Sequence, residues 1–71
     1  MDVTDVSRIV RDLIVAGGFP CTLLRAQNAG QVWRITLEDE RECLVSFDVP
    51  TALRPAHVRA AIQEHLESQW G

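Results

Sequence analysis

Residues 32–49, VWRITLEDERECLVSFDV, carry the pattern that decides the fold. In segment 32–37 apolar side chains alternate with more polar ones, and segment 42–49 repeats this period of two. Such alternation predicts two strands, each with one covered face and one solvated face. The charged segment 38–41 between them is short, which favours an antiparallel pair. The side chains expected to point inward are Trp33, Ile35, Leu37, Cys43, Val45, Phe47 and Val49.

Segment 21–27 is expected to form a further strand, because Asn28-Ala29-Gly30 is a turn signal just ahead of the next strand. Leu23 and Leu24 are adjacent and would point to opposite faces of a regular strand. The pattern therefore predicts the strand but leaves its inner face undecided.

A helix is predicted before the first strand, because apolar residues recur three and four positions apart from Val3 to Ile14. Asp2 or Thr4 is expected to cap its start. Gly17-Gly18 is expected to end it, since glycine tolerates the left-handed backbone that closes a helix.

A second helix is predicted from Pro55 to Trp70, because proline suits the first position of a helix, where its missing N–H costs nothing. Trp70 is expected at the margin of the inner face. The residues expected on that face are Val58, Ala61, Ile62, His65, Leu66 and Gln69.

These elements predict a single small α+β domain spanning residues 1–71, in the order α-β-β-β-α. Each helix has one apolar stripe and the sheet has one apolar face, so both helices should pack on that face of a three-stranded antiparallel meander. This element order resembles the double-stranded RNA-binding domain family.

The resemblance implies a nucleic-acid contact at the start of the second helix, where that family places a lysine-rich cluster. The matching stretch here offers Arg54 and Arg59, and the chain has seven arginines but no lysine. Affinity for a duplex grows with the number of phosphates neutralised, and the net charge is −3. Nucleic-acid binding is therefore an alternative function and not the favoured one.

No set of residues points to catalysis, a metal or a cofactor. His57 and His65 are eight positions apart on the second helix, which separates them by roughly 12 Å, too far for one ion. Cys43 is expected on the buried face, where a thiol is inert. Segment 38–40 and Glu42 are expected at a solvated hairpin tip. We therefore expect a protein that is not an enzyme.

The chain shows no apolar stretch long enough for a secretory signal or for a membrane span of about 20 residues. Two cysteines are too few for a disulfide framework. We therefore expect a soluble, cytoplasmic protein that does not contact a membrane.

The leading hypothesis is a small protein-interaction or regulatory module that binds another protein or a second copy of itself. The open sheet face, the acidic hairpin tip and the last tryptophan are the candidate contact surfaces, because tryptophan and arginine are enriched at binding hot spots. The candidate residues are Arg34, Leu44, Glu38, Asp39, Glu40 and Trp70.

Two further hypotheses remain open. A small acidic protein could inhibit a nucleic-acid enzyme, as phage inhibitors do, with segment 38–42 standing in for phosphates. The chain could also be an enzyme, or a subunit that completes an enzyme's site. A single chain of 71 residues rarely encloses a ligand cavity alone, but a dimer could.

Overall fold

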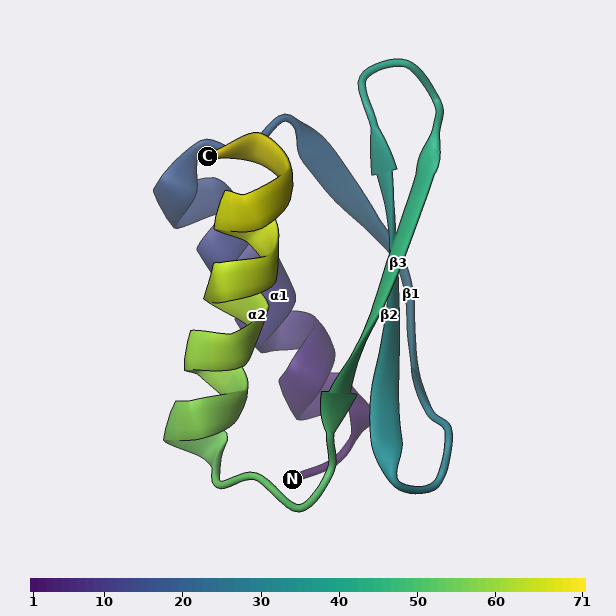
Figure 1. Ribbon diagram of the computed structural model, residues 1–71, viewed down its shortest axis with the longest axis vertical. Coiled ribbons are helices and arrows are strands. Elements are labelled where there is room, and N and C mark those ends of the chain that lie inside the picture. The colour runs from purple at the N-terminus through teal and green to yellow at the C-terminus, as the bar shows by residue number, and fades with distance from the viewer.

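Three strands form one antiparallel sheet in the order β1-β2-β3 in the computed structural model, which describes residues 1–71. The strands are β1 (Cys21–Asn28), β2 (Val32–Asp39) and β3 (Leu44–Pro50). Helix α1 (Val3–Gly17) precedes them and helix α2 (Pro55–Trp70) follows them. The α+β class and the α-β-β-β-α order predicted from the sequence are thus confirmed (Figure 1).

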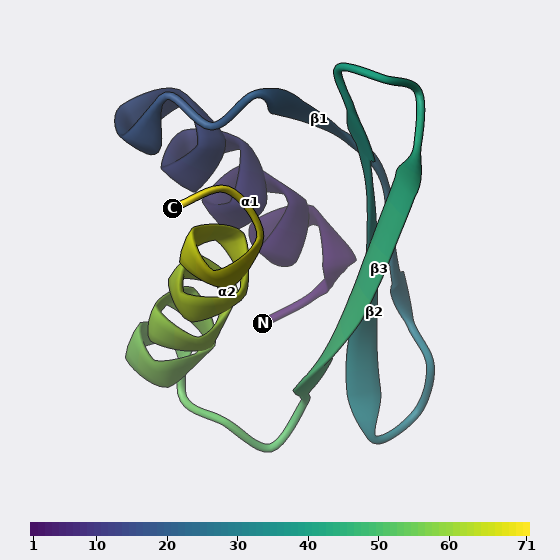
Figure 2. The same ribbon diagram turned by 45° about the horizontal axis from the view of Figure 1, so that its top comes forward.

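Both helices lie on the same side of the sheet, and the opposite face is left open (Figure 2). The space between the layers is filled by twelve buried side chains that form one apolar cluster. They come from all five elements: Val6, Val10, Leu13, Cys21, Trp33, Ile35, Leu37, Phe47, Val49, Val58, Ile62 and Leu66.

A β-bulge in β1 resolves the ambiguity of its two leucines. Leu23 pairs with Leu37 and Arg25 pairs with Thr36, so Leu24 has no partner of its own in the register. The extra residue lets Leu23 pack against the core while Leu24 stays 51% exposed. Alternation alone could not predict this, because a bulge shifts the period by one residue.

Helix α1 is capped at both ends. The Asp2 carboxylate accepts a hydrogen bond from the Asp5 N–H at 3.0 Å, and the Asp5 carboxylate accepts one from the Asp2 N–H. This capping box selects Asp2 over Thr4. At the other end Gly18 adopts φ 65°, the left-handed backbone expected there.

Two sequence predictions about inward side chains are wrong. Cys43 is exposed because β2 continues to Asp39 and the hairpin turn occupies the following residues, so β3 begins only at Leu44. On α2, His65 and Gln69 are exposed, because the helix buries a single row of side chains at four-residue spacing. The His65 ring instead stacks on Phe47 with centroids 4.3 Å apart.

We expect Ile62→Ala to lower the free energy of unfolding by about 2–5 kcal/mol, because Ile62 is fully buried between α2 and the sheet. Urea denaturation followed by circular dichroism measures the loss. Leu24→Ala is the matched control and should change stability by less than about 0.5 kcal/mol, since its side chain is half in solvent. Equal losses in the two variants would contradict this assignment of the core.

Candidate protein-interaction surface

The open face of the sheet presents alternate side chains of β2 and β3. Most of their inward neighbours are buried, so the outward set follows from the register of the two strands. Most of this set is polar, but Val32, Leu44 and Pro50 are apolar. The set consists of Val32, Arg34, Thr36 and Glu38 from β2, and Leu44, Ser46, Asp48 and Pro50 from β3.

An ion pair joins the two strands at the middle of this face. Arg34 and Asp48 are directly opposite in the register, with Nε 3.0 Å from Oδ1 and Nη2 3.3 Å from Oδ2. The hydrogen bonds from Arg34 lower the pKa of Asp48, and Asp48 raises the pKa of Arg34 in turn. The pair cancels the charge of the only carboxylate in β3.

Leu44 is the most exposed large apolar side chain of the sheet, at 65%. It stands opposite Glu38 at the start of β3. Single exposed leucines are common on protein surfaces. Leu44 matters because of its position on an edge strand, where both its side chain and its backbone are available.

The outer edge of β3 carries backbone groups with no partner strand. The N–H of Asp39 donates to the carbonyl of Cys43, and the N–H of Thr51 donates to the carbonyl of Gln31. Because successive residues of a strand point their backbone groups to opposite sides, the odd-numbered residues between these bonds face β2. Leu44, Ser46 and Asp48 therefore direct their N–H and C=O groups away from the sheet.

The other edge of the sheet is less regular. In β1 the residues with outward backbone groups include Leu23, but the bulge at Leu24 interrupts the row. The N–H of Cys21 is already bonded to the carbonyl of Phe19. Bulges of this kind are a recognised means of blunting a sheet edge. The two edges are thus unequal, and β3 offers the longer uninterrupted row.

The acidic hairpin is an ordered turn. Asp39 Oδ1 accepts hydrogen bonds from the N–H groups of Arg41 at 2.8 Å and Cys43 at 2.9 Å. Glu42 adopts φ 62° to complete the turn. Trp70 is half-buried against the core and lines a shallow hollow of about 230 Å³ beside Asp39, Glu40 and Arg41.

The candidate residues from the sequence thus fall into two groups. Arg34, Glu38 and Leu44 lie together on the open face of β2 and β3. Asp39 and Glu40 lie at the hairpin beside Trp70. Sequence reasoning placed Glu38 at the hairpin tip, but it belongs to β2. The sequence-based candidates did not include Ser46 and Asp48. In the hairpin these residues stand opposite Thr36 and Arg34, and counting outward from the turn could have identified them.

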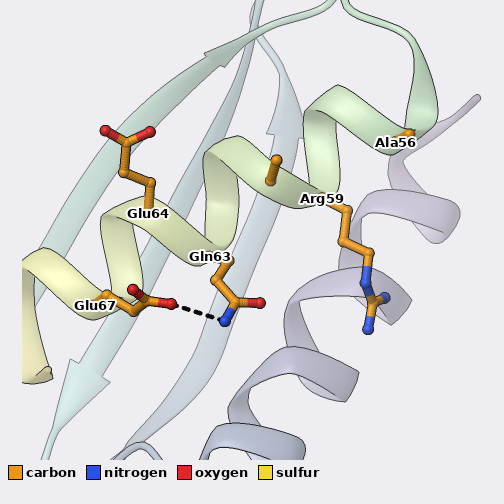
Figure 3. A pocket seen from close by; sticks show the side chains of 6 residues that line it. Ala56, Arg59, Gln63, Glu64 and Glu67 are labelled. Atoms are coloured by element: carbon orange, nitrogen blue, oxygen red, sulfur yellow. Dashed lines mark hydrogen bonds between the residues drawn. The ribbon is translucent and has the colours of Figure 1, made fainter.

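The two arginines suggested for nucleic acid do not form a cluster. Arg54 is the N-cap residue of α2. Arg59 lines a shallow hollow of about 420 Å³ on the outer face of α2, together with Glu64 and Glu67 (Figure 3). Gln63 donates a hydrogen bond to Glu67 there at 2.8 Å. Arg59 is thus the single cation in a hollow that also holds two carboxylates, an arrangement that disfavours phosphate.

Other chemistry has little support in the arrangement of side chains. No group of three His, Cys, Asp or Glu side chains is placed to hold a metal ion. Neither helix is long and apolar enough to cross a membrane. Comparison of the chain with protein-family models, curated proteins and solved structures gave no match.

We expect the Asp48 carboxyl to titrate below the usual range of an aspartate and Arg34→Gln to raise its pKa toward that range, because the variant removes the ion pair. Since the pKa is lower in the folded chain, the pair stabilises the fold at neutral pH and loses this effect as the pH falls through the folded pKa. Carboxyl carbon NMR titration measures both values. An Asp48 pKa that Arg34→Gln leaves unmoved would disprove the ion pair in solution.

The two thiols should differ sharply in reactivity. Cys43 is exposed and should react rapidly with a thiol reagent at pH 8. Burial raises the pKa of Cys21 and shields it, so it should react only after denaturation. Mass spectrometry of timed samples measures both rates. A native chain that modifies both cysteines equally fast would contradict the burial of Cys21.

Proposed function

We propose that this protein is a non-enzymatic interaction module that binds an extended segment of a protein along the free edge of β3. The observation that carries the proposal is the uninterrupted row of outward N–H and C=O groups at Leu44, Ser46 and Asp48. Addition of a strand to such an edge is a common mode of peptide recognition, in which backbone hydrogen bonds supply affinity.

The side chains of this edge support the same reading. Leu44 offers an exposed apolar contact at one end, and the Arg34–Asp48 pair leaves the middle without net charge. Proteins usually protect a free edge with lysine, proline, an unpaired charge or a bulge. Strand β3 has none of these before Pro50, whereas β1 has its bulge at Leu24.

A cytoplasmic setting is part of the proposal. Cys21 and Cys43 are both free thiols, and Cys43 is exposed. Exposed thiols persist most readily where the surroundings are reducing, as in the cytoplasm.

Hydrogen exchange of a ¹⁵N-labelled chain tests the edge. On addition of native extract to a dilute sample, the amides of Leu44, Ser46 and Asp48 should exchange more slowly, because a bound strand would accept their hydrogen bonds. The amide of Leu23 on the opposite edge is the internal control and should not change. Slower amide exchange that is confined to β1 or to the hairpin turn would contradict the proposal.

A backbone variant sharpens this test. Ser46→Pro removes an N–H that points away from β2, so it should leave the fold intact while abolishing the protection. Ser46→Thr keeps the N–H and is the matched control. Protection that survives in Ser46→Pro would show that the edge is not the binding surface.

A further inference from the structure

We propose that the segment bound at the β3 edge is the β3 strand of a second copy of this chain, paired antiparallel about a two-fold axis. The inference rests on the proposed function, because it uses the same edge. An isologous contact of this kind brings identical surfaces together, so the strand must complement itself when its direction is reversed.

The backbone allows only a few registers. Hydrogen-bonded partners must both direct backbone groups outward, which limits them to the even-numbered residues of β3. The turn residue Glu42 is excluded, because its N–H donates to the carbonyl of Asp39. Pro50 has no N–H, and its carbonyl already accepts a hydrogen bond from the N–H of Leu53, so the backbone bonds to a partner come from Leu44, Ser46 and Asp48. Registers centred near either end of β3 shorten the overlap and are weaker.

Side chains exclude most of the remaining registers. Pairing Asp48 with Asp48 of the second copy sets like charges opposite each other. Pairing Leu44 with Ser46 leaves Asp48 opposite the hairpin turn and shortens the overlap. Pairing Ser46 with Ser46 places the apolar Leu44 opposite the Asp48 carboxylate of the second copy. The register that remains pairs Ser46 with Asp48 and Leu44 with Pro50. It matches a hydroxyl donor with a carboxylate and joins two apolar residues.

The inner side of this register is also self-complementary. It places Phe47 opposite Phe47 of the second copy, at the two-fold axis. Phe47 is 9% exposed and its ring is held by stacking on His65. Aromatic pairs directly opposite each other in antiparallel strands are favourable cross-strand contacts. The pairing therefore extends the apolar inner face across the axis.

The charge of the chain predicts how this association responds to salt. Each chain carries net charge −3, so two copies repel each other at long range. The interface contains no ion pair between copies in the proposed register, because Arg34 and Asp48 neutralise each other within one chain. Raising the salt concentration screens the repulsion and should strengthen the dimer.

Sedimentation equilibrium of the purified, reduced chain over a range of concentrations tests the association. A seven-residue edge is a small interface, so we expect a reversible, concentration-dependent dimer. Leu44→Asp should weaken it by at least about tenfold, because the new carboxylate would be desolvated against Pro50. Leu24→Asp is the matched control on the other edge and should leave the dimer unchanged. Equal weakening by both variants, or a monomer at every concentration, would overturn the inference.

Cross-linking tests the register. In a Cys43→Ser background, Ser46→Cys and Asp48→Cys chains should form few disulfides alone but a specific disulfide when mixed and oxidised, since the two positions face each other across the axis. Rapid cross-linking of Ser46→Cys alone would place Ser46 opposite Ser46 and refute the proposed pairing.

The same amides separate this inference from the proposed function. Slower exchange at Ser46 in concentrated purified protein supports the second copy as the partner. Slower exchange only after native extract is added to dilute protein would retain the proposed function and overturn the self-pairing. No protection under either condition would overturn both.

Discussion

Burial of the inner face of β2 is the constraint on which the rest of the structure depends. β2 is the only strand paired on both sides, and Ile35 and Leu37 on it are fully buried. Covering that one face takes both helices, because each contributes a narrow row of apolar side chains. With both helices committed to one side, the opposite face and the outer edges of the sheet are left to solvent. The candidate interaction surface is thus a direct result of how the core is built.

The period of two in β2 and β3 made most of the fold predictable from sequence. Trp33, Ile35 and Leu37 point inward as the alternation requires, and Phe47 and Val49 follow the same rule. Errors arose where the backbone left its regular period. A turn removed Cys43 from the strand, and a bulge decided between Leu23 and Leu24.

The candidate site was less predictable because it consists mainly of backbone. The residues named from sequence were chosen for their side chains, and of these only Leu44 lies on β3, while Arg34 and Glu38 lie opposite it on β2. The direction of each N–H and C=O depends on which opposite residues of the hairpin form hydrogen-bonded pairs. Hydrophobic alternation does not reveal this. His65 shows the same limit on α2, where helical periodicity predicted burial but the ring lies flat on Phe47 at the surface.

The bulge at Leu24 has a consequence for the stoichiometry of any strand pairing. A sheet with two equally open edges can add a further chain at each edge, like a bifunctional monomer in a polymerisation. Each addition leaves a new free edge, so growth can continue into fibrils. Here one end is blunted by the bulge and the other is open, which makes the chain monofunctional. When the β3 edge is occupied by the β3 edge of a second copy, both ends of the joined sheet are bulged β1 edges and assembly terminates. In a complex formed by strand pairing at β3, the single inserted residue of β1 would therefore limit assembly to a finite size.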